Sequence, residues 1–261
     1  LPAGLCRLIL RSSWPCALGE ELNLHVIPAV EIAARHKETG INVHLLCYYP
    51  ADTKRLQKRL DKDLKLFSNS VIRSYQSLMD EYPITMDQLY EASRQSTGIY
   101  YTHIMQVLSL MGYTGQPIGE LHRELFHPGS PHKFQTDYMD AMEAVRLIRS
   151  CGGVPVLAHP GQYKNPMLME MMIEDHMMDG IELNHPRNDE KTMEQIKVLC
   201  KEHDLFMTGG TDFHGLYTTT PYPLGSFLCP EEGLERLIDA GKKANEAYYQ
   251  KKAAKKDPEA D

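Results

Sequence analysis

Short apolar segments recur along this chain, and most are followed by a longer stretch whose apolar residues have helical spacing. The lengths of these segments, their aliphatic residues and the turn residues around them predict buried strands. The predicted strands cover residues 25–31, 41–47, 154–158, 180–184 and 205–209. Only a polar turn separates the first two, so we expect them to pair as a hairpin.

The stretches between and after these strands predict helices. Residues 52–80 carry Lys, Arg, Leu and Asp at helical spacing, which indicates a long amphipathic helix with one charged face. Further helices are predicted over residues 138–150, 166–176, 189–203 and 231–249. Such alternation is typical of an α/β protein whose parallel sheet or barrel carries its ligands at the carboxyl ends of the strands.

Three segments depart from this alternation. Residues 84–137 form short helical patterns broken by Gly and Pro, so we expect a small helical cap insertion. Residues 1–16 hold two arginines, no acidic residue and the only tryptophan, and form an atypical N-terminal segment. Residues 251–261 have nothing to bury and predict a disordered tail. One barrel domain is then expected from residues 17–83 and 138–250.

Composition narrows the choice of partners and compartment. The net charge of -7 argues against a grip on extended duplex nucleic acid, although a local basic pocket could still hold one phosphate. The six cysteines include no C-x-x-C pair, so we expect reduced thiols in a cytoplasmic protein. No apolar run reaches the roughly 18 to 20 residues that a membrane span needs, so no membrane partner is expected.

Polar side chains gather at the predicted strand ends. Asp212 and His214 are two residues apart, and in extended backbone such side chains point to the same face. His159 ends another strand, Glu31 ends the first, and His44 lies within the second. Carboxylate and imidazole ligands without thiolates suit Mn, Fe or Zn. Taken singly, each residue is also compatible with a hydrogen-bonded core or turn residue, which for His44 alone is the favoured interpretation.

Five motifs give the chain a specific resemblance that runs from about Ala17 to Glu232. They are V-I-P-A-V-E-I at 26–32, V-H-L-L-C-Y at 43–48, G-G-V-P-V-L-A-H-P-G at 152–161, G-I-E-L-N-H-P at 180–186 and T-G-G-T-D-F-H-G at 208–215. In this order they resemble the PHP (polymerase and histidinol phosphatase) family of metal-dependent phosphoesterases. The resemblance implies a distorted seven-stranded βα barrel, similar to a TIM barrel, with two or three divalent metals at its mouth. The implied metal ligands are Glu31, His44, His159, Asp212 and His214, and the implied reaction is attack of metal-activated water on a phosphate ester.

Within that family the chain looks most like the branch that acts on nucleoside 3′,5′-bisphosphates and trims short RNA from the 5′ end. Expected substrates are therefore phosphorylated small molecules, nucleotides or short RNA ends. Relatives carry Arg-x-His in the cap, where this chain has Tyr101-Thr102-His103, so His103 keeps a phosphate contact without the guanidinium. His185, Arg187 and Lys133 are further candidates for phosphate binding.

The family pattern opens with H-x-H, a nearby Asp and a strand ending in T-D-H, and this sequence lacks them before Ala17. We therefore expect a truncated chain with an incomplete metal site and impaired activity. One alternative is a noncatalytic remnant that binds a nucleotide or a protein, which metal stoichiometry would distinguish. Another is an amidohydrolase on a similar barrel, disfavoured because an early H-x-H and a bridging lysine are missing.

Overall fold

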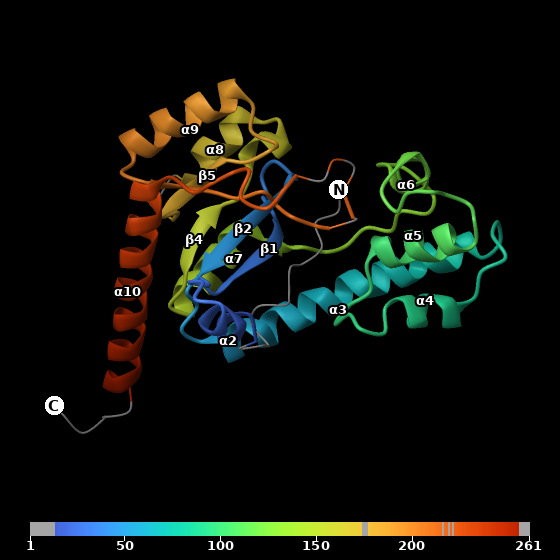
Figure 1. Cartoon of the computed structure of the whole chain (residues 1–261), viewed down its shortest axis with the longest axis horizontal. Coiled ribbons are helices and arrows are strands. Elements are labelled where there is room, and N and C mark those ends of the chain that lie inside the picture. The colour runs from blue at the N-terminus through green and yellow to red at the C-terminus, as the bar shows by residue number, and fades with distance from the viewer. Residues whose placement is uncertain (1–13, 174–176, 216, 219, 221, 256–261) are drawn as a thin grey trace. The chain divides into compact units, whose positions relative to one another are not determined.

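The computed structural model describes residues 14–173, 177–215, 217, 218, 220 and 222–255. They form a mixed α/β fold built on a six-stranded sheet (Figure 1). The chain divides into two compact units, of which one contains Leu60–Asp137 and Phe213–Tyr222. The other contains Leu5–Arg59, Tyr138–Asp212 and Pro223–Asp261, and it holds the whole sheet. Most of the atypical segment 1–16 lies outside the described residues.

The sheet is mixed, with strand order β3-β1-β2-β4-β5-β6. Its strands are β1 (Ala29–Arg35), β2 (Asn42–Tyr48), β3 (Met139–Asp140), β4 (Val154–Leu157), β5 (Gly180–Asn184) and β6 (Phe206–Gly209). β1 and β2 form the predicted antiparallel hairpin, and β2 is also antiparallel to β4. β4, β5 and β6 are parallel, as strand–helix alternation requires.

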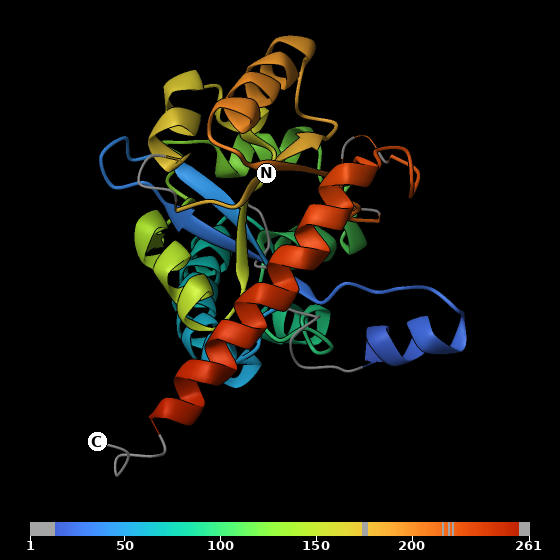
Figure 2. The same ribbon diagram turned by 90° about the vertical axis from the view of Figure 1, so that its left-hand side faces the viewer.

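The helices of the sheet unit are α2 (Trp14–Glu21), α7 (Ala141–Ser150), η1 (Pro160–Tyr163), α8 (Pro166–Ile173), α9 (Glu190–Glu202) and α10 (Glu231–Ala254). Among them, α7, α8, α9 and α10 lie close to their predicted ranges, and α2 and η1 are additional. Asp140 and Asp189 begin α7 and α9 as N-caps, each accepting a hydrogen bond from a backbone N–H in the first turn. Figure 2 shows α10 crossing one face of the sheet, with α7 on the other.

Side-chain alternation along the strands places one apolar cluster and the polar site residues on the same face of the sheet. Val154, Val156 and Phe206 pack with Leu237 of α10 on this face. Leu46 of β2 also packs there and lies opposite Glu31 of β1 in the register. Since alternate residues share a face, Glu31 and His44 project on the side that α10 covers. The same rule puts Glu182 there, because Glu182 is two residues beyond Gly180, where an added Cβ would meet the ring of Phe206.

The other unit is helical. It contains α3 (Thr53–Leu78) from Leu60 onward, α4 (Met86–Ala92), α5 (Tyr101–Leu110) and α6 (Glu120–Phe126). Phe67 and Tyr75 of α3 are buried, as are Ile104 and Leu108 of α5. The short helices over 84–137 match the sequence pattern, while a cap placed over the metal site stays a prediction.

Three expectations need correction. The first strand begins at Ala29 rather than residue 25, because Pro28 has no N–H to donate to the ladder. Glu31 consequently lies inside β1 and not at its end. The helix expected to end at 249 continues to Ala254, and the end of the predicted tail, 256–261, lies outside the described residues. The seven-stranded barrel stays a prediction, since the described strands make one six-stranded sheet.

Among the described helices, none combines the length and the apolar character that crossing a membrane requires. The described cysteines are free thiols. Cys47, Cys151 and Cys200 are buried among apolar neighbours, and burial raises the pKa of the Cys200 thiol to about 12. These thiols are therefore packing groups rather than nucleophiles.

Candidate metal centre

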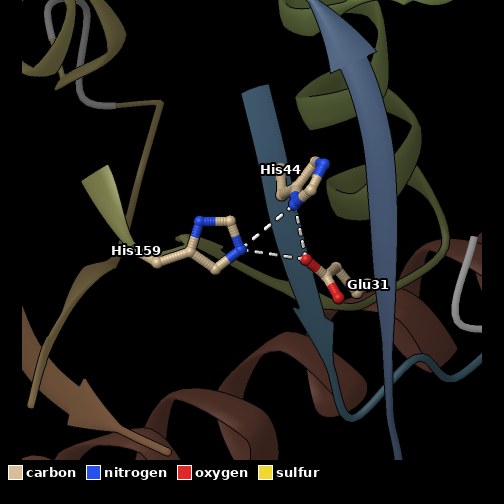
Figure 3. Close-up of side chains that lie close together, drawn as sticks. All are labelled: Glu31, His44 and His159. Carbon is tan, nitrogen blue, oxygen red and sulfur yellow. Dashed lines mark hydrogen bonds and ion pairs between the residues drawn. The ribbon is translucent and has the colours of Figure 1, made fainter. Parts of the chain in front are cut away.

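Glu31, His44 and His159 meet on the face of the sheet that α10 covers (Figure 3). Oε1 of Glu31 lies 2.7 Å from Nδ1 of His44 and 3.1 Å from Nε2 of His159. The two imidazole nitrogens are themselves 3.1 Å apart. Three ligand atoms from separate parts of the chain thus converge on one point.

The sheet register explains why two of these side chains meet. Glu31 lies opposite Leu46, and His44 lies two residues before Leu46 on the same face of β2. His159 reaches them from beyond the end of β4, where its backbone adopts φ 28° and ψ 61°. Tyr163 supports this arrangement, because its hydroxyl accepts a hydrogen bond from the His44 N–H at 2.7 Å and donates one to the carbonyl of Ala158 at 3.0 Å.

Two neighbouring histidines, His159 and His44, keep Glu31 ionised. Burial by itself would raise the pKa of this carboxyl, but hydrogen bonds with His159 and His44 outweigh burial and bring the pKa far below its usual range. Glu31 is therefore an ionised carboxylate facing two imidazoles. This combination of oxygen and nitrogen ligands is the one that zinc, iron and manganese accept.

The spacing of the three ligand atoms fits a cation. At the roughly 90° angles of octahedral coordination, bonds of roughly 2.0–2.2 Å from a metal put neighbouring ligand atoms about 3 Å apart, close to the separations of 2.7 and 3.1 Å seen here. Nδ1 of His159 and Nε2 of His185 are also buried without a hydrogen-bond partner among the described residues. Buried polar atoms of this kind indicate that the site is completed by groups other than these side chains.

A second carboxylate beside the cluster, Glu182 of β5, was missed at the level of sequence. Glu182 is 6% exposed, and its Oε2 accepts a hydrogen bond from the backbone N–H of His159 at 2.9 Å. Burial, with smaller contributions from the charges of Glu31 and Asp212, raises the pKa of Glu182 to about 8 against the opposing effect of that hydrogen bond. The available signal was a lone acid in the otherwise apolar strand G-I-E-L-N, which is unusual for a strand buried on both faces.

His185 lies next to the cluster, with its ring centroid 4.9 Å from that of His159. Its Nδ1 accepts a hydrogen bond from the N–H of Arg187 at 3.0 Å. Burial lowers the pKa of His185 although Asp212 opposes this, so the ring is neutral and carries its proton on Nε2. That Nε2 lies 3.8 Å from Oδ2 of Asp212, and its N–H is suited to an anionic oxygen rather than to a metal.

The extended backbone expected at Asp212 and His214 is wrong, while their role as metal ligands stays a prediction. Asp212 has φ 49°, so the backbone is not extended there and the two side chains need not share a face. β6 ends at Gly209, three residues before Asp212. Asp212 is half-buried beside His185, whereas His214 is exposed and belongs to the other compact unit.

The remaining candidates are placed as follows. His103 belongs to the helical unit and is half-buried at the start of α5, where its Nδ1 accepts a hydrogen bond from the N–H of Tyr100 at 3.1 Å. This bond gives His103 a helix-capping role of its own. Lys133 of the same unit is exposed, as is Arg187 of the sheet unit.

Comparison with known proteins supplies relatives for most of the chain. No family model matches it. The phosphoribosyl 1,2-cyclic phosphate 1,2-diphosphodiesterase of Eggerthella lenta is 30% identical over 210 residues, which make up 78% of this chain and 79% of that protein. The 3′,5′-nucleoside bisphosphate phosphatase of Chromobacterium violaceum is 30% identical over 96 residues, which cover 35% of this chain and 34% of that protein.

Solved structures share the fold. A protein of Bifidobacterium adolescentis described as a metal-dependent phosphoesterase superposes with a TM-score of 0.79 at 22% identity, covering 90% of this chain and 84% of its own. An amidohydrolase of Chromobacterium violaceum, solved with bound sulfate, gives a TM-score of 0.66 at 20% identity, with 86% and 81% of the two chains covered. At these identities the likeness establishes the architecture alone.

Proposed function

The chain belongs to the PHP family of metal-dependent phosphoesterases, and on that basis we propose that it hydrolyses a phosphate ester of a nucleotide, a ribose phosphate or a short RNA end. The observation that carries this proposal is the convergence of Glu31, His44 and His159 on one point. The seven-stranded barrel and a cytoplasmic location belong to the same proposal and rest on the sequence.

We propose Glu31, His44 and His159 as ligands of manganese, iron or zinc. A divalent cation held there supplies Lewis-acid activation of water and neutralises phosphate charge. Glu31 provides an anionic oxygen that contacts both imidazoles. The Tyr163 hydroxyl bonds to the backbone N–H of His44 and to the carbonyl of Ala158, the residue before His159, and so holds the backbone next to both imidazoles. The family site holds two or three cations. From the resemblance alone, we propose Asp212 and His214 as ligands of the further cations.

We propose His185 and Arg187, which follow β5, as contacts for the phosphate of the substrate. Neutral His185 offers its buried Nε2–H beside the cluster, where a phosphate oxygen could accept it. Arg187, two residues on, is exposed and can form a bidentate contact with phosphate. His103 and Lys133 are proposed contacts on the resemblance alone.

The relatives suggest which phosphate esters to try. The Eggerthella lenta relative, which matches most of this chain, is by name a diesterase for a ribose cyclic phosphate. The shorter match is to a phosphatase for nucleoside bisphosphates. We propose a ribose-linked phosphate as the common element, since both names contain one.

The proposal is tested by removing metal with a chelator and then adding back Mn²⁺, Fe²⁺ or Zn²⁺. Phosphate release is measured from a nucleoside 3′,5′-bisphosphate, and ring opening from a ribose 1,2-cyclic phosphate. We expect metal-dependent hydrolysis of one of these, lowered at least about 100-fold by Glu31→Gln or His159→Ala. His203→Ala, at the end of α9, is the matched control and should keep full activity.

Hydrolysis that persists in Glu31→Gln at the unchanged rate would contradict the proposed role of the cluster. A chain that binds metal through these residues but turns over no phosphate ester would favour the noncatalytic alternative. Binding is read independently by calorimetry with Mn²⁺.

A further inference from the structure

Glu182 is a buried acid that the metal cluster does not include. Its carboxylate projects from β5 on the same face as Glu31 and His44, and its side chain is almost without solvent contact. A buried carboxylate needs a specific partner to offset its lost hydration. The partner that the structure provides is the backbone N–H of His159, 2.9 Å from Oε2.

That N–H belongs to a residue in an unfavourable conformation. His159 has φ 28° and ψ 61°, in the left-handed region that residues with a Cβ seldom occupy. It is also followed by Pro160, which disfavours helical backbone in the residue before it. A conformation of this kind costs on the order of 1–3 kcal/mol and persists only where its surroundings hold it in place.

The surroundings of His159 come mainly from β5 and the loop after it. Glu182 accepts a hydrogen bond from the N–H of His159, and Oδ1 of Asn188 accepts one from the N–H of Gly161 at 2.9 Å. Asn188 in turn donates to the carbonyls of Glu182 and Leu183 at 2.8 and 2.9 Å. The turn is thereby fixed to β5 at two points on either side of Pro160.

We propose that Glu182 is a positioning residue: its carboxylate holds the backbone of His159 in the left-handed conformation that aims the imidazole at Glu31 and His44. This inference rests on the proposed function insofar as the aimed imidazole is a metal ligand. Glu182 acts through an oxygen acceptor at a fixed distance from β5, so neither its charge nor a direct bond to metal is required.

Two conservative variants distinguish a positioning role from a role as a charge or a metal ligand. One changes the ionisable group and the other changes the length of the side chain. Glu182→Gln keeps the length of the side chain and an oxygen that accepts the His159 N–H, but replaces the ionisable carboxyl group by a neutral amide. Glu182→Asp keeps the carboxyl group and is one methylene shorter, so its oxygens fall short of that N–H. Positioning predicts Mn²⁺ affinity within about 3-fold of the unchanged chain for Gln and a loss of at least about 10-fold for Asp.

Affinity is measured by calorimetry with Mn²⁺, and the visible spectrum of Co²⁺ reports the ligand set. The amide resonance of His159 is followed by ¹H–¹⁵N NMR in metal-free protein. Under the proposal this resonance persists, protected from exchange, in Glu182→Gln and loses protection in Glu182→Asp. Thermal melts confirm that both variants are folded.

The reverse order of affinities, with Asp retaining metal and Gln losing it, would overturn the proposal and make Glu182 a charge or a ligand. Equal affinities for all three proteins would also overturn it. If the unchanged chain bound no Mn²⁺, the proposed function would fail, and the His159 resonance in metal-free protein would still decide the role of Glu182.

Discussion

We expect the substitution Gly233→Ala in α10 to destabilise the packing of this helix against the sheet that carries the site. A Cβ built there would lie 1.8 Å from the carbonyl oxygen of Met207 in β6, where real Cβ contacts stay above 3.0 Å. The obstacle is the backbone of a sheet strand, so no side chain can turn aside to make room. In Gly233→Ala, α10 must therefore move away from the sheet by roughly an ångström.

That movement loosens the apolar cluster of Leu237, Val154, Val156 and Phe206. Overpacking costs typically 1–3 kcal/mol, and a clash with backbone belongs near the upper end of about 3 kcal/mol. Alanine regains up to about 1 kcal/mol of helix propensity over glycine. The net loss of about 2 kcal/mol should lower the Tm by roughly 4–8 °C in a chain of this size.

Thermal and urea unfolding followed by circular dichroism measure this loss. Glu235→Ala, exposed on the same helix, is the matched control and should stay within about 0.5 kcal/mol of the unchanged chain. A Gly233→Ala protein as stable as the unchanged chain would refute the close packing of α10 on β6. Mn²⁺ affinity should fall with stability, because β6 leads into the segment that carries Asp212.

Two further perturbations have defined outcomes. Tyr163→Phe leaves the His44 N–H and the Ala158 carbonyl without their partner, so we expect a loss of about 1–3 kcal/mol in urea unfolding together with weaker Mn²⁺ binding. His122 is buried, and burial lowers its pKa to about 4 from the 6.5 of an unfolded chain. The unfolded state binds the proton first as pH falls, so the stability from His122 is present above pH 6.5 and is lost toward pH 4. His122→Phe should then remove on the order of 2 kcal/mol of the acid destabilisation measured between pH 7 and 4.

The fold was predictable where local pattern and tertiary contacts agree. β5 was predicted at its observed bounds, because the short segment before the His185–Pro186 turn has the length and the flanking residues of a buried strand. The start of β1 was misplaced, since the apolar run 25–31 continues through Pro28 while the hydrogen-bond ladder cannot. The antiparallel position of β2 between β1 and β4 depends on long-range pairing that periodicity does not report.

At the candidate site, the sequence likewise predicted residues but not the contacts between them. His44 and Glu31 were singled out by motif, yet their contact follows from a register that only the folded hairpin defines. Asp212 and His214 were paired by assuming extended backbone, and the left-handed φ of Asp212 removes that assumption. Glu182 was overlooked because its importance lies in a hydrogen bond to the backbone of His159, 23 residues away in sequence.

We propose above that Glu31, His44 and His159 hold a divalent cation for phosphoester hydrolysis. Crystals grown with Mn²⁺ and measured at the manganese absorption edge test it most directly. We expect an anomalous peak within bonding distance, roughly 2.0–2.3 Å, of Oε1 of Glu31, Nδ1 of His44 and Nε2 of His159. Manganese bound elsewhere, with these three side chains still paired only with one another, would contradict it.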